Sequence, residues 1–331
     1  MTTEKLVKMA NSIVDEILNL LAEYGAMSSK EIAIELKMRG IPLEPRTVRY
    51  HLKKLEEKGL IAKTSNGKRE ITKKGLEEIR QKNVFGRLGE FSEKIEYTAY
   101  FCNFDLYKME GEVPTNIAIV DKDKFEKVLD VLMDMQEFKF LISKLIVIAE
   151  ENEVLGNIEI PSGKFGVATI SNTIYDVIMR SAGVNMIPEF AGLLRCESMK
   201  PRGFTELISY AGTTLSPGWL FLRSGLTSVY QCLKKGVGEI ITAIRSFSIH
   251  AIDIVRDEIL LAESRGFKGI IYILYPSSKL FKLPYGNRAR LIISAGLNYL
   301  APLYELGFNP EIRVSEVFIN LKDFKDINKI H

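Results

Sequence analysis

Residues 45–72 read PRTVRYHLKKLEEKGLIAKTSNGKREIT, and this stretch decides the fold of the N-terminal part of the chain. Proline suits the first turn of a helix and glycine the position just after its end, so we expect a helix over residues 45–58. At about 100° per residue, Val48, Leu52 and Leu55 share one side of that helix. Basic residues occupy the other side, so the helix combines an apolar face with a cationic face.

A short β-hairpin is expected after this helix. Residues 60–63 (LIAK) and 70–72 (EIT) have strand character, and the Asn66-Gly67 pair between them suits a tight hairpin turn. The hairpin carries further basic residues, and residues 74–82 predict a helix packed behind it.

Two helices are expected before the cationic one. Apolar residues recur every three or four positions over residues 6–21, which predicts an amphipathic helix that ends at Gly25. Ser28 and Glu31 have the spacing of a capping box at the start of the second helix. The order helix, helix, cationic helix, hairpin is that of a winged helix-turn-helix.

Charge is distributed unevenly along the 331 residues, whose formal net charge is +3. Residues 1–84 hold 17 Lys and Arg against 12 Asp and Glu, whereas residues 85–331 hold 28 against 30. Residues 44–74 alone hold ten basic and four acidic residues. We therefore expect a basic winged-helix domain at 1–84, joined to a larger and nearly neutral domain at 85–331.

The cationic helix and hairpin suit duplex DNA, because the major groove admits one α-helix and basic side chains neutralise phosphates. The residues expected to read bases are Arg46, Thr47, Arg49 and Tyr50. The residues expected to bind phosphates are Lys53, Lys54, Lys63, Lys68 and Arg69. The alternative is that these charges form a solvated face and the winged helix docks on another protein.

The larger region alternates strand and helix patterns, which predicts an α/β domain with a mixed sheet. Strand character is found at residues 97–104, where alternation is loose, and at 115–120, 144–149, 166–170 and 269–274. Helix character is found at residues 124–135, 171–182 and 249–264. A weak echo of strand-then-helix units, ended by Gly183, Gly266 and Gly296, suggests two similar lobes.

Several classes of function lose support from the sequence. Three separated cysteines and three separated histidines, with no helical pair, argue against a disulfide framework and a metal site, and His250 has no nucleophile signature near it. We therefore expect a protein without catalytic activity or cofactor. The sequence shows no long apolar segment and no leader pattern, so we expect a cytoplasmic protein that does not cross a membrane.

Segments 210–219 and 223–228, rich in Gly, Ser and Thr, are the places where a small anion would be expected to bind. Arginine offers a fork that matches a carboxylate. The candidate residues are Arg195, Arg202, Thr205, Thr213, Thr214, Ser216, Arg223, Ser224, Thr227 and Ser228. The alternative is that these segments are ordinary turns and that the arginines pair with Glu197, Glu206 or Glu189.

The chain resembles the archaeal nitrogen-regulation repressor family NrpR over essentially its whole length. The resemblance is carried by residues 45–52 (PRTVRYHL), 192–194 (GLL), 201–206 (PRGFTE), 210–215 (YAGTTL), 225–229 (GLTSV), 283–288 (LPYGNR) and 296–298 (GLN). It implies a homodimeric repressor of nitrogen-assimilation genes that binds operator DNA and releases it when 2-oxoglutarate binds the regulatory domain.

The resemblance leaves alternatives open, because family members carry one or two regulatory domains and this chain has room for one. The chain is then a repressor by itself, a companion of a second NrpR-type subunit, or a winged-helix regulator of another pathway with a different small anionic effector. A metabolic enzyme with a DNA-binding appendage and a protein-interaction adaptor are the rivals from other classes of function.

Overall fold

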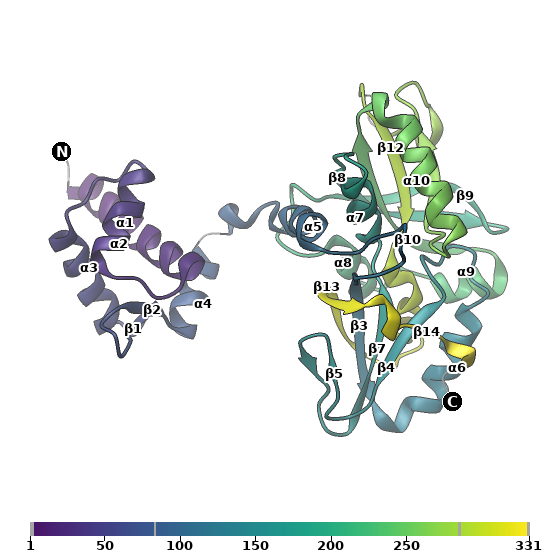
Figure 1. Ribbon diagram of the computed structural model, residues 1–331, viewed down its shortest axis with the longest axis horizontal. Helices are drawn as coiled ribbons and strands as arrows, with labels where there is room; N and C mark the ends of the chain where they lie inside the picture. Colours follow the sequence, from purple (N-terminus) through teal and green to yellow (C-terminus); the bar gives the residue numbers. More distant parts are fainter. Residues whose placement is uncertain (1–2, 83, 284–285, 330–331) are drawn as a thin grey trace. The chain divides into compact units, whose positions relative to one another are not determined.

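The computed structural model describes residues 3–82, 84–283 and 286–329. The chain forms two compact units, Met1–Arg87 and Leu88–His331 (Figure 1). Pro284 and Tyr285, which belong to one of the family-like segments, lie outside the described residues.

The first unit is a winged helix, as the sequence predicts. Its elements are α1 (Thr3–Tyr24), α2 (Ser29–Met38), α3 (Pro45–Glu57), β1 (Ile61–Lys63), β2 (Arg69–Ile71), α4 (Lys73–Lys82) and the short 3-10 helix η1 (Phe85–Arg87). Strands β1 and β2 pair antiparallel, with Ala62 opposite Glu70. The order of elements predicted from residues 45–72 is therefore confirmed.

Local sequence signals fix these elements as expected. The backbone N–H of Ser28 donates to Glu31 Oε2 at 2.6 Å and the Glu31 N–H donates to Ser28 Oγ at 3.3 Å, which completes the predicted capping box. Val48, Leu52 and Leu55 are buried in the core of the unit. Met27 also pairs with Arg69 of the hairpin through two backbone hydrogen bonds, a contact that no local sequence pattern predicts.

The second unit is an α/β domain. Its first half contains α5 (Glu90–Phe101), β3 (Glu112–Asp121), η2 (Lys122–Lys124), α6 (Phe125–Met135), β4 (Leu145–Ala149), β5 (Val154–Leu155), β6 (Ile158–Glu159), β7 (Lys164–Ile170), α7 (Ile174–Ser181), β8 (Ile187–Glu197), β9 (Lys200–Ser209), α8 (Pro217–Arg223) and α9 (Val229–Lys235). Its second half contains β10 (Gly238–Phe247), η3 (Ile249–Ala251), α10 (Ile252–Ser264), β11 (Ile270–Leu274), η4 (Leu280–Lys282), β12 (Ala289–Ser294), η5 (Gly296–Tyr299), α11 (Ala301–Glu305), β13 (Glu311–Asn320), η6 (Leu321–Asp323), β14 (Lys325–Asp326) and η7 (Ile327–Lys329).

Two five-stranded sheets organise this unit, one in the upper and one in the lower half of Figure 1. Their strand orders are β11-β12-β10-β8-β9 and β13-β3-β7-β4-β14. Each strand pair found in the described residues is antiparallel, which differs from the expected mixed sheet. The reason is that β7 lies between β3 and β4, so the two strands joined by α6 run in the same direction without pairing.

The two lobes that contain these sheets repeat one another. The order β3, α6, β4, β7 in one lobe corresponds to β10, α10, β11, β12 in the other, and in both the last of the three strands lies between the other two. The strand that leaves each lobe joins the other: β8 pairs with β10, and β13 pairs with β3. The two lobes therefore share strands as well as a core.

A pair of tyrosines marks corresponding positions of the repeat. Tyr175 follows β7 and its hydroxyl oxygen accepts from the Gly269 N–H at 2.7 Å, just before β11. Tyr299 follows β12 and its hydroxyl donates to the Lys144 carbonyl at 3.5 Å, just before β4. Each lobe thus contributes a tyrosine hydroxyl that binds the backbone at the start of a strand in the other lobe. Gly296, which was expected to end a strand-then-helix unit, instead begins η5.

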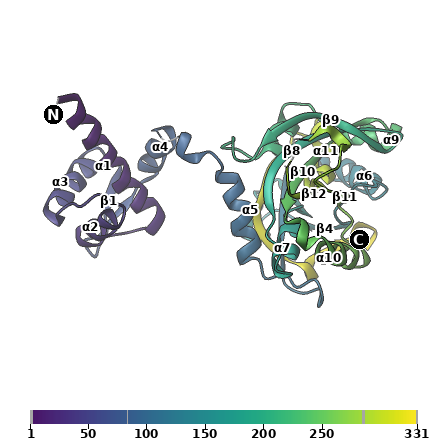
Figure 2. The ribbon, with the colours of Figure 1, turned by 90° about the horizontal axis from the view of Figure 1, so that it is seen from above.

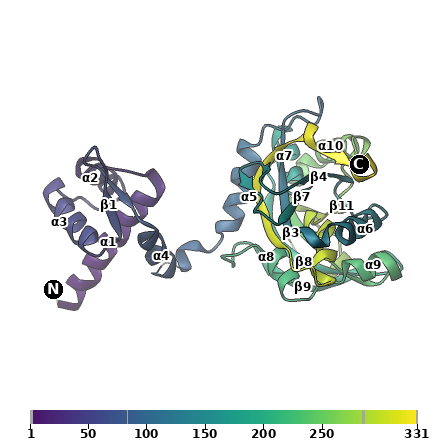
Figure 3. The same ribbon diagram turned by 90° about the horizontal axis from the view of Figure 1, so that it is seen from below.

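The sequence prediction lacks strands β8, β10, β12 and β13, and two further parts of the second unit differ from it. Residues 97–104 were expected to have strand character, but α5 continues to Phe101 and buries Ile95 and Thr98 on one face. Figures 2 and 3 show α5 on the side of this unit opposite α6 and α10. Strand β9 was missed because it contains Pro201 and Gly203, which an edge strand tolerates and a central strand does not.

Candidate functional site

Helix α3 presents its cationic face to solvent. Arg46, Thr47, Arg49, Tyr50, Lys53 and Lys54 are all exposed, and the Tyr50 side chain is 57% exposed. Two contacts arrange this face: Arg49 Nε donates to the Pro45 carbonyl at 3.3 Å, and Lys54 Nζ lies 4.4 Å from the centre of the Tyr50 ring. The opposite face is anchored in the core, so the cationic side chains keep a fixed direction relative to the unit.

The positive charges of this face, and that of Lys63 on the hairpin, lack an acidic partner among the described residues. In the described part of the chain no salt bridge joins Arg46, Arg49, Lys53, Lys54 or Lys63 to an acidic side chain. An exposed cation with no acidic partner is available to an external anion. Phosphates of a nucleic acid backbone are the most closely spaced anions that such a face meets.

The hairpin residues divide into two kinds. Lys63 is exposed, whereas Lys68 Nζ pairs with Glu31 Oε1 at 2.9 Å. Arg69 donates from Nη1 to the Gly67 carbonyl at 2.8 Å and lies 3.5 Å from Glu56. These contacts tie the hairpin to α2 and α3, so Lys68 and Arg69 also shape the wing.

His51 lies at the margin of the apolar face of α3 and is half-buried. Burial and the nearby Lys54 both lower the pKa of His51. Its ring meets the Tyr50 ring edge-on at 5.7 Å between centres, so the side chain packs as a structural residue.

A cavity lies between the two lobes of the second unit. Its walls come from α5 (Phe91, Ile95), from the loops after β7 and β12, and from strands β8, β10 and β13. Its polar lining consists of Asn172, Thr173, Tyr210, Ser216, Thr242, Arg245 and Ser315. Sites between lobes are where small-molecule ligands are commonly bound, because both sides contribute to the lining.

Arg245 on β10 is the charged side chain of this cavity, and none of its surface is exposed. Its Nε donates to Asp176 Oδ1 at 2.9 Å, and its guanidinium carbon lies 4.9 Å from the centre of the Tyr210 ring. Nη1 and Nη2 of Arg245 have no hydrogen-bond partner among the described residues. These two nitrogens carry four N–H groups that can donate to an acceptor.

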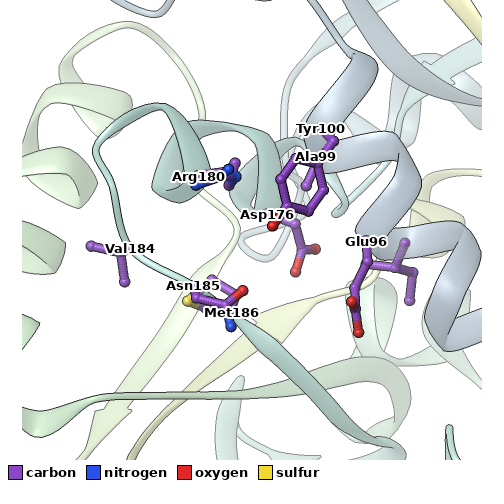
Figure 4. Close-up of a pocket in the computed structure, with 9 residues that line it drawn as sticks. Glu96, Ala99, Tyr100, Asp176, Arg180, Val184, Asn185 and Met186 are labelled. Atoms are coloured by element: carbon purple, nitrogen blue, oxygen red, sulfur yellow. The ribbon is translucent and has the colours of Figure 1, made fainter.

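Asp176 faces a second, smaller cavity on its other side. This cavity lies between α5 and α7, and Figure 4 shows the carboxylates of Asp176 and Glu96 directed into it. The Arg180 guanidinium carbon lies 4.2 Å from the centre of the Tyr100 ring in the same region. Burial raises the pKa of Asp176, although the charge of Arg245 opposes this.

The predicted effector residues on β8 and β9 form a separate group. Arg195 Nη1 pairs with Glu239 at 3.1 Å, Arg202 Nε pairs with Glu197 at 3.2 Å, and Thr205 Oγ1 donates to Glu239 at 3.0 Å. Both arginines and Thr205 are exposed. The structure thus brings three of the predicted residues together on an ion-paired sheet surface.

The predicted effector residues of the loops have other places. Ser216 caps α8 by accepting from the Trp219 N–H at 3.4 Å, and it is the one member of the predicted set that lines the cavity beside Arg245. Arg223 is exposed, with its guanidinium carbon 4.9 Å from the centre of the Trp219 ring. The remaining members are Thr213, which bonds within its own turn, half-buried Thr214, exposed Ser224, buried Thr227, and Ser228, which accepts from the Glu239 N–H.

Two known protein families match parts of this chain. A family model described as NrpR regulatory domains NRD1 and 2 matches residues 88–326, which is most of the chain. This chain belongs to the NrpR family. A model described as the Ribonuclease R winged-helix domain matches residues 15–79 of the same chain.

Named relatives of this NrpR-family chain come from methanogens. Global nitrogen regulator NrpRI of Methanosarcina mazei is 29% identical over 314 residues, which cover 94% of this chain and 97% of that protein. Global nitrogen regulators NrpR of Methanococcus maripaludis and Methanocaldococcus jannaschii are 28% and 27% identical, covering 70% and 95% of this chain. The matches span only 40% and 55% of those two proteins' own lengths.

A solved structure supports the fold of the NrpR regulatory domain. The crystal structure of a nitrogen repressor-like protein from Methanococcus jannaschii matches with a TM-score of 0.60 and 21% identity. The match covers 71% of this chain and 97% of that chain. The α/β architecture of the second unit is therefore shared with a known NrpR-like structure.

Other features of this NrpR chain bear on the sequence predictions. Cys196 and Cys232 are buried as expected and Cys102 is half-buried, where burial raises the pKa of its thiol to about 11. The described residues contain no cluster of His, Cys, Asp and Glu able to hold a metal ion. No described helix is long and apolar enough to cross a membrane.

Sequence analysis missed Arg245 as a functional candidate. It lies in the segment 238–247 (GEIITAIRSF), which reads as a buried strand interrupted by one arginine. A lone charge in an otherwise apolar central strand is a recognisable signal, because such a charge needs a buried partner.

Proposed function

We propose that this chain is a ligand-responsive transcriptional repressor of nitrogen-assimilation genes. In this proposal α3 enters the major groove of operator DNA and the hairpin contacts the flanking phosphates. The second unit, which the sequence predicts as residues 85–331, binds the small acid 2-oxoglutarate and holds two chains together as a homodimer. No turnover and no cofactor are needed for this activity.

The cationic face of α3 is the observation that carries the DNA-binding part of the proposal. Residues in the first turns of a recognition helix reach base edges, and Arg46, Thr47, Arg49 and Tyr50 occupy those turns. Arginine can donate two hydrogen bonds to one guanine. Lys53, Lys54, Lys63, Lys68 and Arg69 would supply the phosphate contacts.

The nitrogen-regulation part rests on the family. Three relatives carry the name global nitrogen regulator, and one of them matches this chain over 97% of its own length. The resemblance of the regulatory domain implies 2-oxoglutarate as effector. This acid accumulates when nitrogen is scarce, so its binding would release the operator and permit transcription.

The homodimer part follows from how winged helices read operators. Two α3 helices about 34 Å apart can enter successive major grooves on one side of a duplex. An effector that binds one dimer geometry more tightly than another shifts the population between them and misplaces the helices.

A gel-shift titration of the full chain on promoter DNA, at two salt concentrations and with or without 2-oxoglutarate, tests the proposal. A protein contacting six phosphates loses affinity by about 10³-fold between 50 and 200 mM salt. We expect a loss of this order and release by 2-oxoglutarate. Salt-independent binding would favour the protein-interaction adaptor, and DNA binding that requires a second NrpR-type chain would favour the companion subunit.

A further inference from the structure

Arg245 carries more donor capacity than the fold uses. The side chain is fully buried, and its closest acceptors are Asp176, which accepts from Nε at 2.9 Å, and the neighbouring Tyr210. Buried charged donors without partners are costly, and native proteins satisfy them with protein groups, water or ligands. Nη1 and Nη2 therefore point to an acceptor that the protein itself does not supply.

Asp176 meets this need only in part, because it accepts from Nε and not from Nη1 or Nη2. Oδ2 of Asp176 also lacks a partner among the described residues, and the carboxylate borders the small cavity shared with Glu96 (Figure 4). Arg245 lines one cavity and Asp176 the other, so the ion pair lies between the two cavities.

The walls beside Arg245 are largely apolar, and the space between them is about 20 Å³, room for about one water molecule, so a short carbon chain fits only when the walls move apart. The Phe91 ring stacks on the Tyr210 ring with 6.0 Å between centres, and Ile95 and Leu297 add apolar surface. The Tyr210 ring also lies over the Arg245 guanidinium. A planar carboxylate bound edge-on to that guanidinium would lie under the same ring. These side chains exclude water from a ligand bound at Arg245.

The polar part of the same cavity is formed by hydroxyl groups. Ser315 and Thr173 line it, and Ser171 links them through hydroxyl contacts of 2.7 Å to Ser315 and 3.2 Å to Thr173. Ser315 holds this position with a φ of 49°, a backbone conformation that non-glycine residues adopt rarely. Hydroxyls can bind an oxo, hydroxyl or second carboxylate group of a ligand.

We propose that this cavity is a binding site for a small carboxylic acid with a second polar group, whose carboxylate accepts hydrogen bonds from Nη1 and Nη2 of Arg245. The choice of 2-oxoglutarate as first ligand rests on the proposed function, whereas the site rests on the contacts above. A carboxylate is the natural acceptor because two parallel N–H groups of arginine match its two oxygens.

Calorimetric titration of the full chain with 2-oxoglutarate tests the site. Arg245→Lys keeps the charge but loses the fork, and we expect the dissociation constant to rise at least about tenfold. Arg290→Lys is the matched control, because Arg290 is a half-buried arginine on the neighbouring strand whose Nε already pairs with Glu189 at 2.5 Å. The affinity of Arg290→Lys for 2-oxoglutarate should stay within about twofold of that of the unaltered chain, as expected for a change outside the site.

A second variant covers the case in which Arg245→Lys does not fold. Asp176→Asn keeps the shape of the pair and removes the competing charge, so it should bind the acid more tightly than the unaltered chain. An unchanged dissociation constant in a folded Arg245→Lys chain, or weaker binding by Asp176→Asn, overturns the proposal.

The titration also separates the site from the proposed function. Binding of glutarate or another small carboxylate that depends on Arg245, without binding of 2-oxoglutarate, supports the site and contradicts the effector. Binding of 2-oxoglutarate that depends on Arg245, without release of DNA in the gel shift, supports the site and contradicts the mechanism of release. Absence of binding by every carboxylate tested overturns the site.

Discussion

Asp176 and Arg245 form a buried ion pair joined by one hydrogen bond, Nε to Oδ1 at 2.9 Å, although each side chain has further groups to offer. A well-matched arginine–carboxylate pair is usually bidentate. Here the pairing is partial, and it occurs where α7 of one lobe meets β10 of the other. The contact thus joins the two lobes and leaves donors free for a ligand.

Replacing Asp176 with Asn should destabilise the ligand-free protein. The change leaves the Arg245 charge buried without a counter-charge, and breaking a buried pair in this way costs about 3 kcal/mol or more. Because a bound carboxylate would restore the counter-charge, 2-oxoglutarate should raise the melting temperature of the variant more than that of the unaltered chain. Differential scanning calorimetry with and without the acid measures both effects.

Glu189→Gln is the control for this prediction, since it neutralises the acid of the Arg290 pair outside the cavity. An equal rise in melting temperature on adding 2-oxoglutarate to both variants would contradict the role given to Asp176.

Replacing Lys53 with Gln should weaken operator binding and reduce its salt dependence. Lys53 is exposed on the cationic face of α3 and has no acidic partner among the described residues. Loss of one phosphate contact reduces the slope of log affinity against log salt by about 1. Fluorescence anisotropy over a salt series measures the slope.

Lys127→Gln makes the same charge change on an exposed residue of α6 in the second unit. Equal slopes for Lys53→Gln and Lys127→Gln would show that the face of α3 does not contact phosphates.

Glu31 should make the stability of the winged helix depend on acid pH. The backbone N–H of Ser28, followed by the Lys68 side chain, lowers the pKa of Glu31 to about 2. A carboxyl group with a lowered pKa stabilises the folded state above its unfolded pKa of 4.5, and this contribution is lost as the pH falls from 4.5 toward 2. Glu31→Gln cannot titrate.

The difference in melting temperature between the unaltered chain and Glu31→Gln should therefore shrink between pH 5.5 and pH 2.5. Circular dichroism at both pH values measures it. A difference that stays constant with pH would rule out an ionised Glu31 as part of the cap.

Sequence patterns were sufficient for the winged helix because its signals are local. The capping box at Ser28, the proline at position 45 and the hairpin glycine each act within a few residues of the structure they determine. The strands of the second unit depend on partners far along the chain, such as β13 pairing with β3. No local pattern contains that information.

The candidate cavity likewise depends on contacts between residues that are far apart in the sequence. Gly- and Thr-rich turns suggested an anion site around Arg195, Arg202 and Arg223, and their role stays a prediction. The first two are exposed and paired with acids. Arg245 needed the fold to place it beside Asp176, because the two residues are distant in sequence and in different lobes. We expect Arg245→Lys to lose more affinity for 2-oxoglutarate than the triple change of these three residues to Gln.

Helix α5 should transmit occupancy of the cavity to the winged helix. It begins at Glu90, just after the boundary between the two units at Arg87 and Leu88, and it contributes Phe91 and Ile95 to the cavity wall. A ligand at Arg245 therefore contacts the first helix of the second unit. Coupling of this kind requires the ligand to bind one position of the helix more tightly than another.

Phe91→Ala should weaken this coupling more than it weakens binding, because it removes the stacking contact of α5 with Tyr210 and leaves Arg245 unchanged. The measured quantity is the ratio of the 2-oxoglutarate concentration that releases half of the DNA to the dissociation constant from calorimetry. We expect this ratio to rise several-fold in Phe91→Ala. Phe125→Ala, which removes an aromatic contact of α6 with Phe165 on the opposite side of the unit, should leave the ratio unchanged. A ratio that is equal in the two variants would mean that the signal reaches the DNA-binding unit by another route.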